Sequence, residues 1–94
     1  MSDESCRADV WLWRARFFKT RSMAARFIDE GRIRFTRASA EGRLDKASRG
    51  LKRGDELVFA LGGRVIAVRL AAFGERRGPP CEARALYEPL DPPE

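Results

Sequence analysis

The spacing of apolar residues near the start of the chain predicts a short helix that is apolar on two sides. Residues 9–18 read as this helix, and Trp13 and Phe17, four residues apart, form an apolar pair on one side of it. A helix apolar on two sides packs on both or offers one side to a partner. The other apolar side comprises Ala8, Trp11, Leu12, Ala15 and Phe18.

A second helix is predicted directly after Thr20, which is a suitable N-cap residue. Gly31 fits the left-handed conformation that commonly ends a helix. Arg26 and Asp29 are expected on the solvent side of this helix. The predicted apolar stripe consists of Met23, Ala24, Phe27 and Ile28.

Strands are predicted next. Residues 32–36 alternate with period two, so that Ile33 and Phe35 face the core. Residues 57–61 and 64–70 read as two further strands, joined by a two-residue hairpin turn at Gly62-Gly63.

Four segments carry no strand pattern. Residues 37–53 are expected to be a polar, basic loop, and residues 74–80 a second loop. Residues 81–87 are predicted to form one or two helical turns, because Pro79-Pro80 are tolerated at a helix start. Residues 89–94 contain three prolines and two acids and are expected to fray.

This order of elements predicts an α+β fold, with a helix-helix-strand module packed on a small, mostly antiparallel sheet and a short C-terminal helical turn. Ninety-four residues suffice for one modest core. We expect a flexible N-terminus over residues 1–6, a single domain over residues 7–88 and a flexible tail over residues 89–94.

The positive charge is concentrated in the first half of the chain. Residues 7–53 hold 14 basic and 5 acidic residues, which gives 14 − 5 = +9, whereas the whole chain carries +5. Of the 19 cations 16 are arginine, which binds phosphate bidentately and stacks on bases. This favours nucleic acid as a partner, and an arginine-rich genome is the alternative explanation.

The composition argues against several classes of site. The chain has no histidine, and Cys6 and Cys81 lack metal-ligand spacing, so we expect no zinc site, no histidine-based catalysis, no cofactor and no enzymatic activity. No apolar run approaches the roughly 20 residues of a membrane span. The acidic N-terminus is unlike a signal peptide, so we expect a cytoplasmic protein. We also expect a monomer.

The most informative segment is the corner between the two predicted helices. Arg16, Lys19 and Arg21 lie within six residues of one another beside a predicted helix start. A helix N-terminus and its N–H groups favour anions, so this arrangement suits a phosphate backbone. An ordinary solvated corner is the alternative.

These residues resemble the alpha-L RNA-binding domain first described in small-subunit ribosomal protein four. The matching positions are Arg7-Ala8-Asp9, Thr20-Arg21, Ala24, Ile28 and Gly31-Arg32-Ile33. The chain is more similar still to the heat-shock protein fifteen family of ribosome-associated proteins, over roughly residues 7–88. The residues that carry this likeness are Trp11-Leu12-Trp13, Ala15-Arg16-Phe17, Lys19-Thr20-Arg21, Arg76-Arg77 and Leu86-Tyr87-Glu88.

The chain departs from the family pattern in its loops. The Asn-Gly that usually follows the first strand is missing, since Phe35 is followed by Thr36-Arg37, and the usual Lys-Pro-Ser is replaced by Lys46-Ala47-Ser48. The resemblance implies binding of ribosomal RNA of the large subunit and a role with stalled nascent-chain complexes.

Charge, position and resemblance together give the candidate RNA-binding residues, which are Arg7, Arg14, Arg16, Lys19, Thr20, Arg21, Arg32, Arg34, Arg37 and Lys46. Arg32 and Arg34 could instead protect an edge strand from aggregation. Residues 37–53 could be no more than a solvated loop. Arg76-Arg77 and Tyr87 stay open between RNA contact and a surface ion-pair patch.

Three function classes remain. The first is non-catalytic binding of structured RNA, read by shape and backbone contacts. The second is an accessory RNA-binding domain of an RNA-modifying enzyme. The third is a protein–protein adaptor anchored by Trp13 and Phe17, although such aromatic residues are more often core.

Overall fold

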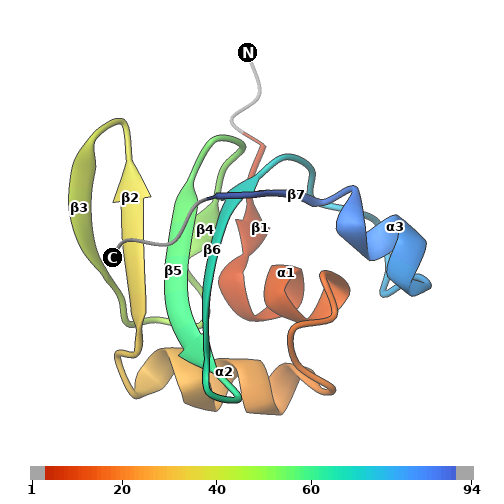
Figure 1. Ribbon diagram of the computed structural model, residues 1–94, viewed down its shortest axis with the longest axis horizontal. Helices are drawn as coiled ribbons and strands as arrows, with labels where there is room; N and C mark the ends of the chain where they lie inside the picture. The colour runs from red at the N-terminus through yellow and green to blue at the C-terminus, as the bar shows by residue number, and fades with distance from the viewer. Residues whose placement is uncertain (1–3, 91–94) are drawn as a thin grey trace.

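The computed structural model describes residues 4–90, and the predicted α+β class is confirmed (Figure 1). Three helices and seven strands form in these residues. In chain order they are β1 (Cys6–Arg7), α1 (Ala8–Arg14), α2 (Arg21–Asp29), β2 (Ile33–Arg37), β3 (Ala40–Leu44), β4 (Gly50–Leu51), β5 (Glu56–Leu61), β6 (Arg64–Leu70), α3 (Pro80–Arg84) and β7 (Tyr87–Pro89).

All strand pairs are antiparallel. The main sheet has the order β3-β2-β5-β6-β7, and β1 pairs with β4 in a separate two-stranded ribbon. Phe35 in β2 lies opposite Gly42 in β3 and Leu57 in β5, which fixes the register at the centre of the sheet. Figure 1 shows α2 crossing the foot of the strands, with α1 beside it and α3 on the side away from β3.

The core lies between the helices and the inward face of the sheet. Trp11 and Leu12 from α1 are completely buried, as are Ile28 from α2 and Ile33 from β2. Burying one large apolar side chain stabilises the fold by roughly 1.5–3 kcal/mol. The predicted inward direction of Ile33 and Phe35 is confirmed, and it leaves Arg34 on the opposite face.

Three local predictions of the sequence are confirmed. The Thr20 hydroxyl accepts a hydrogen bond from the Met23 N–H at 3.1 Å and caps α2. Gly31 adopts a φ of 70° directly after that helix. Gly62 and Gly63, with φ of 61° and 80°, form the turn between β5 and β6.

The first helix is shorter than predicted, because it ends at Arg14 rather than at residue 18. Arg16 takes a φ of 66°, its N–H bonds to the Trp13 carbonyl at 3.0 Å, and the Phe17 N–H bonds to the Leu12 carbonyl at 3.1 Å. These two bonds make a Schellman ending, which usually has glycine where this chain has Arg16. The missing glycine explains why the sequence did not predict the ending.

The prediction that residues 37–53 form a loop is wrong, because β3 and β4 lie within them. Ala38 and Ser39 turn the chain between β2 and β3 with φ of 50° and 70°, in place of a glycine-containing turn. Leu44 is the only residue of β3 that is buried. An edge strand exposed on most of its length has no apolar alternation, so the pattern was absent from the sequence.

The C-terminal elements also differ from the prediction. The helical turns span Pro80–Arg84, and Tyr87 begins strand β7 instead of ending the helix. Pro89, expected to fray, pairs with Val68, and Cys6 pairs with Leu51 at the other end of the chain. The rest of the expected tail, residues 91–94, lies outside the described residues.

One side chain of the predicted apolar stripe is not buried. Met23 is 50% exposed, whereas Ala24, Phe27 and Ile28 enter the core. Within residues 4–90, the structure contains no helix long and apolar enough to cross a membrane.

Candidate nucleic-acid interface

The basic corner, defined here as residues 16–21, forms because α1 ends abruptly at Arg14 and α2 begins at Arg21. The side chains of Arg16, Lys19 and Arg21 are all exposed. The Thr20 cap leaves other N–H groups of the first turn of α2 without helical partners, and the helix dipole places partial positive charge there. The corner therefore combines side-chain cations with a helix N-terminus, as anion binding requires.

Arg16 holds the corner against a distant loop. Its guanidinium donates to the Gly78 carbonyl at 2.9 Å, while much of the side chain stays exposed. This bond fixes the corner relative to α3, which begins at Pro80.

Arg7 and Arg21 meet at a buried carboxylate. Asp9 is 4% exposed, and it accepts from Arg7 Nε at 3.1 Å and lies 3.7 Å from an Arg21 terminal nitrogen. Both arginine side chains remain about half exposed. The carboxylate thus orients two cations while leaving each able to reach a phosphate with its remaining N–H groups.

Backbone hydrogen bonds place the segment that contains Lys46 beside the start of α1. The Asp9 N–H donates to the Ala47 carbonyl at 3.2 Å, and the Ala8 N–H donates to the Arg49 carbonyl at 2.9 Å. These bonds place the turn that carries Lys46 against the start of α1. The structure therefore gathers Lys46 with Arg7 and Arg21, although the sequence separates them widely.

Arg14, also predicted as an RNA contact, points into the protein. It donates to the Gly74 carbonyl at 2.8 Å and approaches the Cys6 sulfur at 3.8 Å. Its Nε is buried, with no hydrogen-bond partner among the described residues. Burial raises the pKa of the Cys6 thiol, although Arg14 acts in the opposite direction. Arg14 therefore serves to hold residues 71–78 beside α1, as the Trp11 ring does by donating to the Ala72 carbonyl at 2.8 Å.

Arg37 is also used by the fold. It forms two hydrogen bonds to the Asp55 carboxylate, at 2.9 and 2.7 Å, and donates to the Gly50 carbonyl at 3.0 Å. Asp55 is 2% exposed and accepts the Lys52 N–H as well, at 2.7 Å. The hydrogen bonds that Arg37 donates to the Asp55 carboxylate raise the pKa of Arg37. Arg37 is therefore held by Asp55 and Gly50, and it positions neighbouring residues rather than reaching into solvent.

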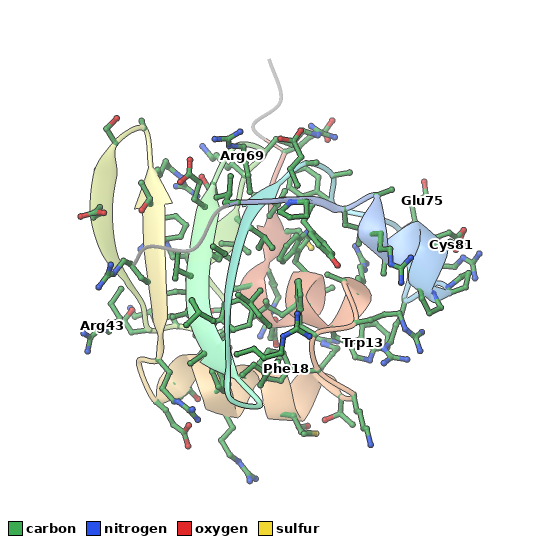
Figure 2. All side chains as sticks on the ribbon, viewed as in Figure 1. Trp13, Phe18, Arg43, Arg69, Glu75 and Cys81 are labelled. Carbon is green, nitrogen blue, oxygen red and sulfur yellow. The ribbon has the colours of Figure 1, made fainter. Side chains whose placement is uncertain are left out.

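Arg32 lies directly before β2, and Arg34 lies within this strand. Arg32 pairs with Glu30 at 3.3 Å and lies 4.3 Å from the centre of the Phe27 ring. Arg34 is exposed on the sheet face away from the helices, directly opposite Arg43 in β3. Figure 2 shows Arg43 extending outward beyond the edge strand.

Arg26 and Arg43 were not among the predicted residues, although both are exposed cations near them. Arg26 faces solvent as predicted, one turn beyond Met23 on α2. Its place on a helix that begins at the corner was the available signal. For Arg43 the signal was missing, because β3 was not predicted.

The structure weakens the alternative in which Trp13 and Phe17 anchor a protein partner. Phe17 is packed against Phe59 and Tyr87, with ring centres 5.6 and 5.0 Å apart, so its ring belongs to the edge of the core. Trp13 is partly buried.

Arg76 pairs with Glu82 at 3.1 Å, as a surface ion pair would.

The segment from β1 to the start of β2 matches a known class of domain. Residues 6–34, from β1 to the start of β2, match the family model of the S4 domain. This segment contains both helices, the basic corner and the buried Asp9, so the module described above is an S4 domain.

Relatives extend the likeness over most of the chain. Heat shock protein 15 of Escherichia coli is 35% identical over 87% of this chain and 58% of its own length, and the Haemophilus influenzae homologue is 35% identical over 94% and 63%. The RQC P-site tRNA stabilizing factor of Halalkalibacterium halodurans is 33% identical over 87% of this chain and 86% of its own length. The chain spans about three fifths of the two heat shock proteins.

The solved structure of Vibrio cholerae heat shock protein 15 has the same fold, with a TM-score of 0.81, 29% identity and coverage of 93% of this chain and 83% of that one. The chain therefore belongs to the heat shock protein 15 family. The Vibrio protein is described as trimeric, which counts against our expectation of a monomer.

Proposed function

We propose that this protein is a non-catalytic module that binds structured RNA of the ribosome, with residues 7–88 as the single RNA-binding domain. The observation that carries the proposal is the corner itself, where exposed cations lie beside the N-terminus of α2. Phosphate contacts of this kind position a protein on folded RNA without reading sequence.

The ten candidate residues divide into two groups in this proposal. Arg14 and Arg37 support the scaffold through their bonds to Gly74 and Asp55. The other eight are exposed and contact the RNA backbone, and they are Arg7, Arg16, Lys19, Thr20, Arg21, Arg32, Arg34 and Lys46.

The family supports a ribosomal partner. One relative is named for stabilising P-site tRNA in RQC, and others are heat shock proteins 15. We infer that this chain binds the large ribosomal subunit in complexes stalled with a nascent chain.

The test replaces Arg16, Lys19 and Arg21 together by Ala. We expect most binding to large ribosomal subunits to be lost, because the corner loses three cations. For wild type, displacement of counterions from about five phosphates predicts that log affinity falls against log salt with a slope of roughly −3 to −5. Co-sedimentation at two salt concentrations measures both effects.

The matched control replaces Arg64 and Arg69 by Ala. Both are exposed, but Arg69 already pairs with Glu56 and Glu88, so little binding should be lost. Circular dichroism must show unchanged helix content in both variants. If the corner variant binds as well as wild type, or if both variants weaken equally, the corner is not the RNA site.

A further inference from the structure

An aromatic groove lies beside the basic corner, between α2 and the turn that joins β5 to β6. This open groove has a volume of about 570 Å³, within the range of small-ligand sites. Its floor is apolar and its rim is charged. The lining residues used below are Phe17, Phe18, Phe27 and Leu61 on the floor, and Lys19, Met23, Arg26, Glu30 and Arg32 around the rim.

The floor of the aromatic groove is held in place by the core. The Phe18 and Phe27 ring centres are 5.1 Å apart, and Phe27 lies 5.9 Å from Phe59 at 71°. Figure 2 shows Phe18 between α2 and the sheet. Because these rings pack against one another, the groove is formed before any ligand arrives, and binding needs little rearrangement.

One wall of the groove is formed by Met23, an apolar side chain that is exposed to water. Met23 is 50% exposed, on a helix whose other large apolar residues are buried. A flexible thioether makes favourable contacts with aromatic rings and adapts to irregular ligands. The wall is therefore suited to a flat aromatic group lying on the floor.

Arg32 adds a stacking surface. Its guanidinium lies 4.3 Å from the Phe27 ring centre, and Glu30 holds it at 3.3 Å. One side of the guanidinium is thus occupied by a ring, while the side chain remains about half exposed. Planar guanidinium groups stack on nucleic-acid bases as well as binding phosphate.

The charge of the rim identifies the ligand class. The rim carries three cations, Lys19, Arg26 and Arg32, and one carboxylate, Glu30, so it favours an anion. Lys19 and Arg32, which both line the groove, are also two of the proposed RNA contacts. A strand that follows the backbone contacts from the corner to β2 would pass over the groove.

We propose that the aromatic groove binds one unpaired nucleotide of the RNA, with its base against Met23 and the phenylalanine rings and its phosphates on Lys19, Arg26 and Arg32. The inference rests on the proposed function and adds to it a site for a base. It explains an exposed methionine and a preformed aromatic hollow that backbone contacts alone do not require.

The experiment compares two probes of equal charge, a hexa-adenylate RNA and the same oligomer with its bases removed. Fluorescence anisotropy with the full chain, at one fixed salt concentration, gives both affinities. We expect roughly tenfold weaker binding of the abasic probe, as for the loss of one stacked base. The Met23→Ser variant should reduce this ratio, while the matched control Val65→Ser should preserve it, since Val65 is similarly exposed (54%) on the opposite sheet face.

A second measurement locates the base. A hexanucleotide with 4-thiouridine at its centre is cross-linked by light, and the modified peptides are identified by mass spectrometry. Attachment to residues 17–32 supports the proposal, whereas attachment to other peptides alone overturns it.

The outcomes separate the groove from the corner. Equal affinity for both probes, with binding to ribosomal subunits intact, would refute the groove and leave the proposed function standing. If the protein bound neither ribosomal subunits nor either probe, both the nucleotide site in the groove and the proposed function would be refuted. Binding of an acidic peptide that depends on Met23, with no preference for bases, would assign the groove to a protein partner instead.

Discussion

The two cation-rich segments of the chain use the same residue types in different ways. In the basic corner, Lys19 projects from the surface and has no ion-pair partner among residues 4–90. In residues 37–53, Arg37 is bound to Asp55, and Arg53 pairs with Glu4 at 3.0 Å and lies 4.6 Å from the Phe73 ring centre. Both segments are rich in cations, with three in residues 16–21 and six in residues 37–53, but the availability of these cations to a ligand differs.

The difference comes from what surrounds each cation. A buried carboxylate such as Asp55 needs a charged partner in the folded protein, because an unpaired charge is costly to bury. The buried carboxylate beside the corner is Asp9, which pairs with Arg7 and Arg21 but leaves both side chains about half exposed. Density of positive charge therefore indicates RNA binding only where the fold leaves the cations to solvent.

Removing Asp55 should have the largest effect on stability. Asp55→Ala leaves Arg37 and the Lys52 N–H without their acceptor. We expect the free energy of unfolding to fall by about 3 kcal/mol, at the low end for a broken buried pair because Arg37 is 34% exposed. Urea denaturation measures the loss.

The double variant Arg37→Met, Asp55→Leu is the control for this prediction. It removes both charges at once, so it should lose less than the sum of the two single variants. A loss below about 1 kcal/mol for Asp55→Ala would show that the pair is not structural and would break the contrast between the segments.

Removing the Thr20 cap should have a smaller effect, confined to the corner. Thr20→Ala removes the acceptor of the Met23 N–H and should lower the free energy of unfolding by about 1 kcal/mol. Thr20→Ser keeps a hydroxyl acceptor and should stay close to wild type. Thermal denaturation of the two variants compares them, and equal stability would mean that the hydroxyl does not stabilise α2.

Arg16→Gly should have the smallest effect on stability and still weaken RNA binding. Glycine adopts the φ of 66° without strain, which offsets the lost bond to Gly78, so the free energy of unfolding should change by less than about 1 kcal/mol. Binding to ribosomal subunits should fall severalfold, with a salt slope less steep by roughly one. Unchanged binding in a stable variant would remove Arg16 from the interface.

Local signals allowed several turns and helix ends of the fold to be predicted. The Thr20 cap, the φ of Gly31 and the Gly62-Gly63 turn each depend on the conformational preference of one or two residues. The end of α1 and the β2–β3 turn were not predicted, because Arg16 and Ala38-Ser39 adopt positive φ without glycine. Tertiary packing has to impose such conformations, and a local pattern cannot show it.

By itself, the sequence determined the α+β class, the position of the corner and the concentration of cations in its first half, since these depend on periodicity, capping and charge. The tertiary structure alone decided which cations remain available. Arg14 and Arg37 became part of the scaffold because Gly74 and Asp55, far away in the chain, lie within hydrogen-bonding distance of them. Burial and pairing are properties of groups brought together by folding, so the composition of the chain cannot show them.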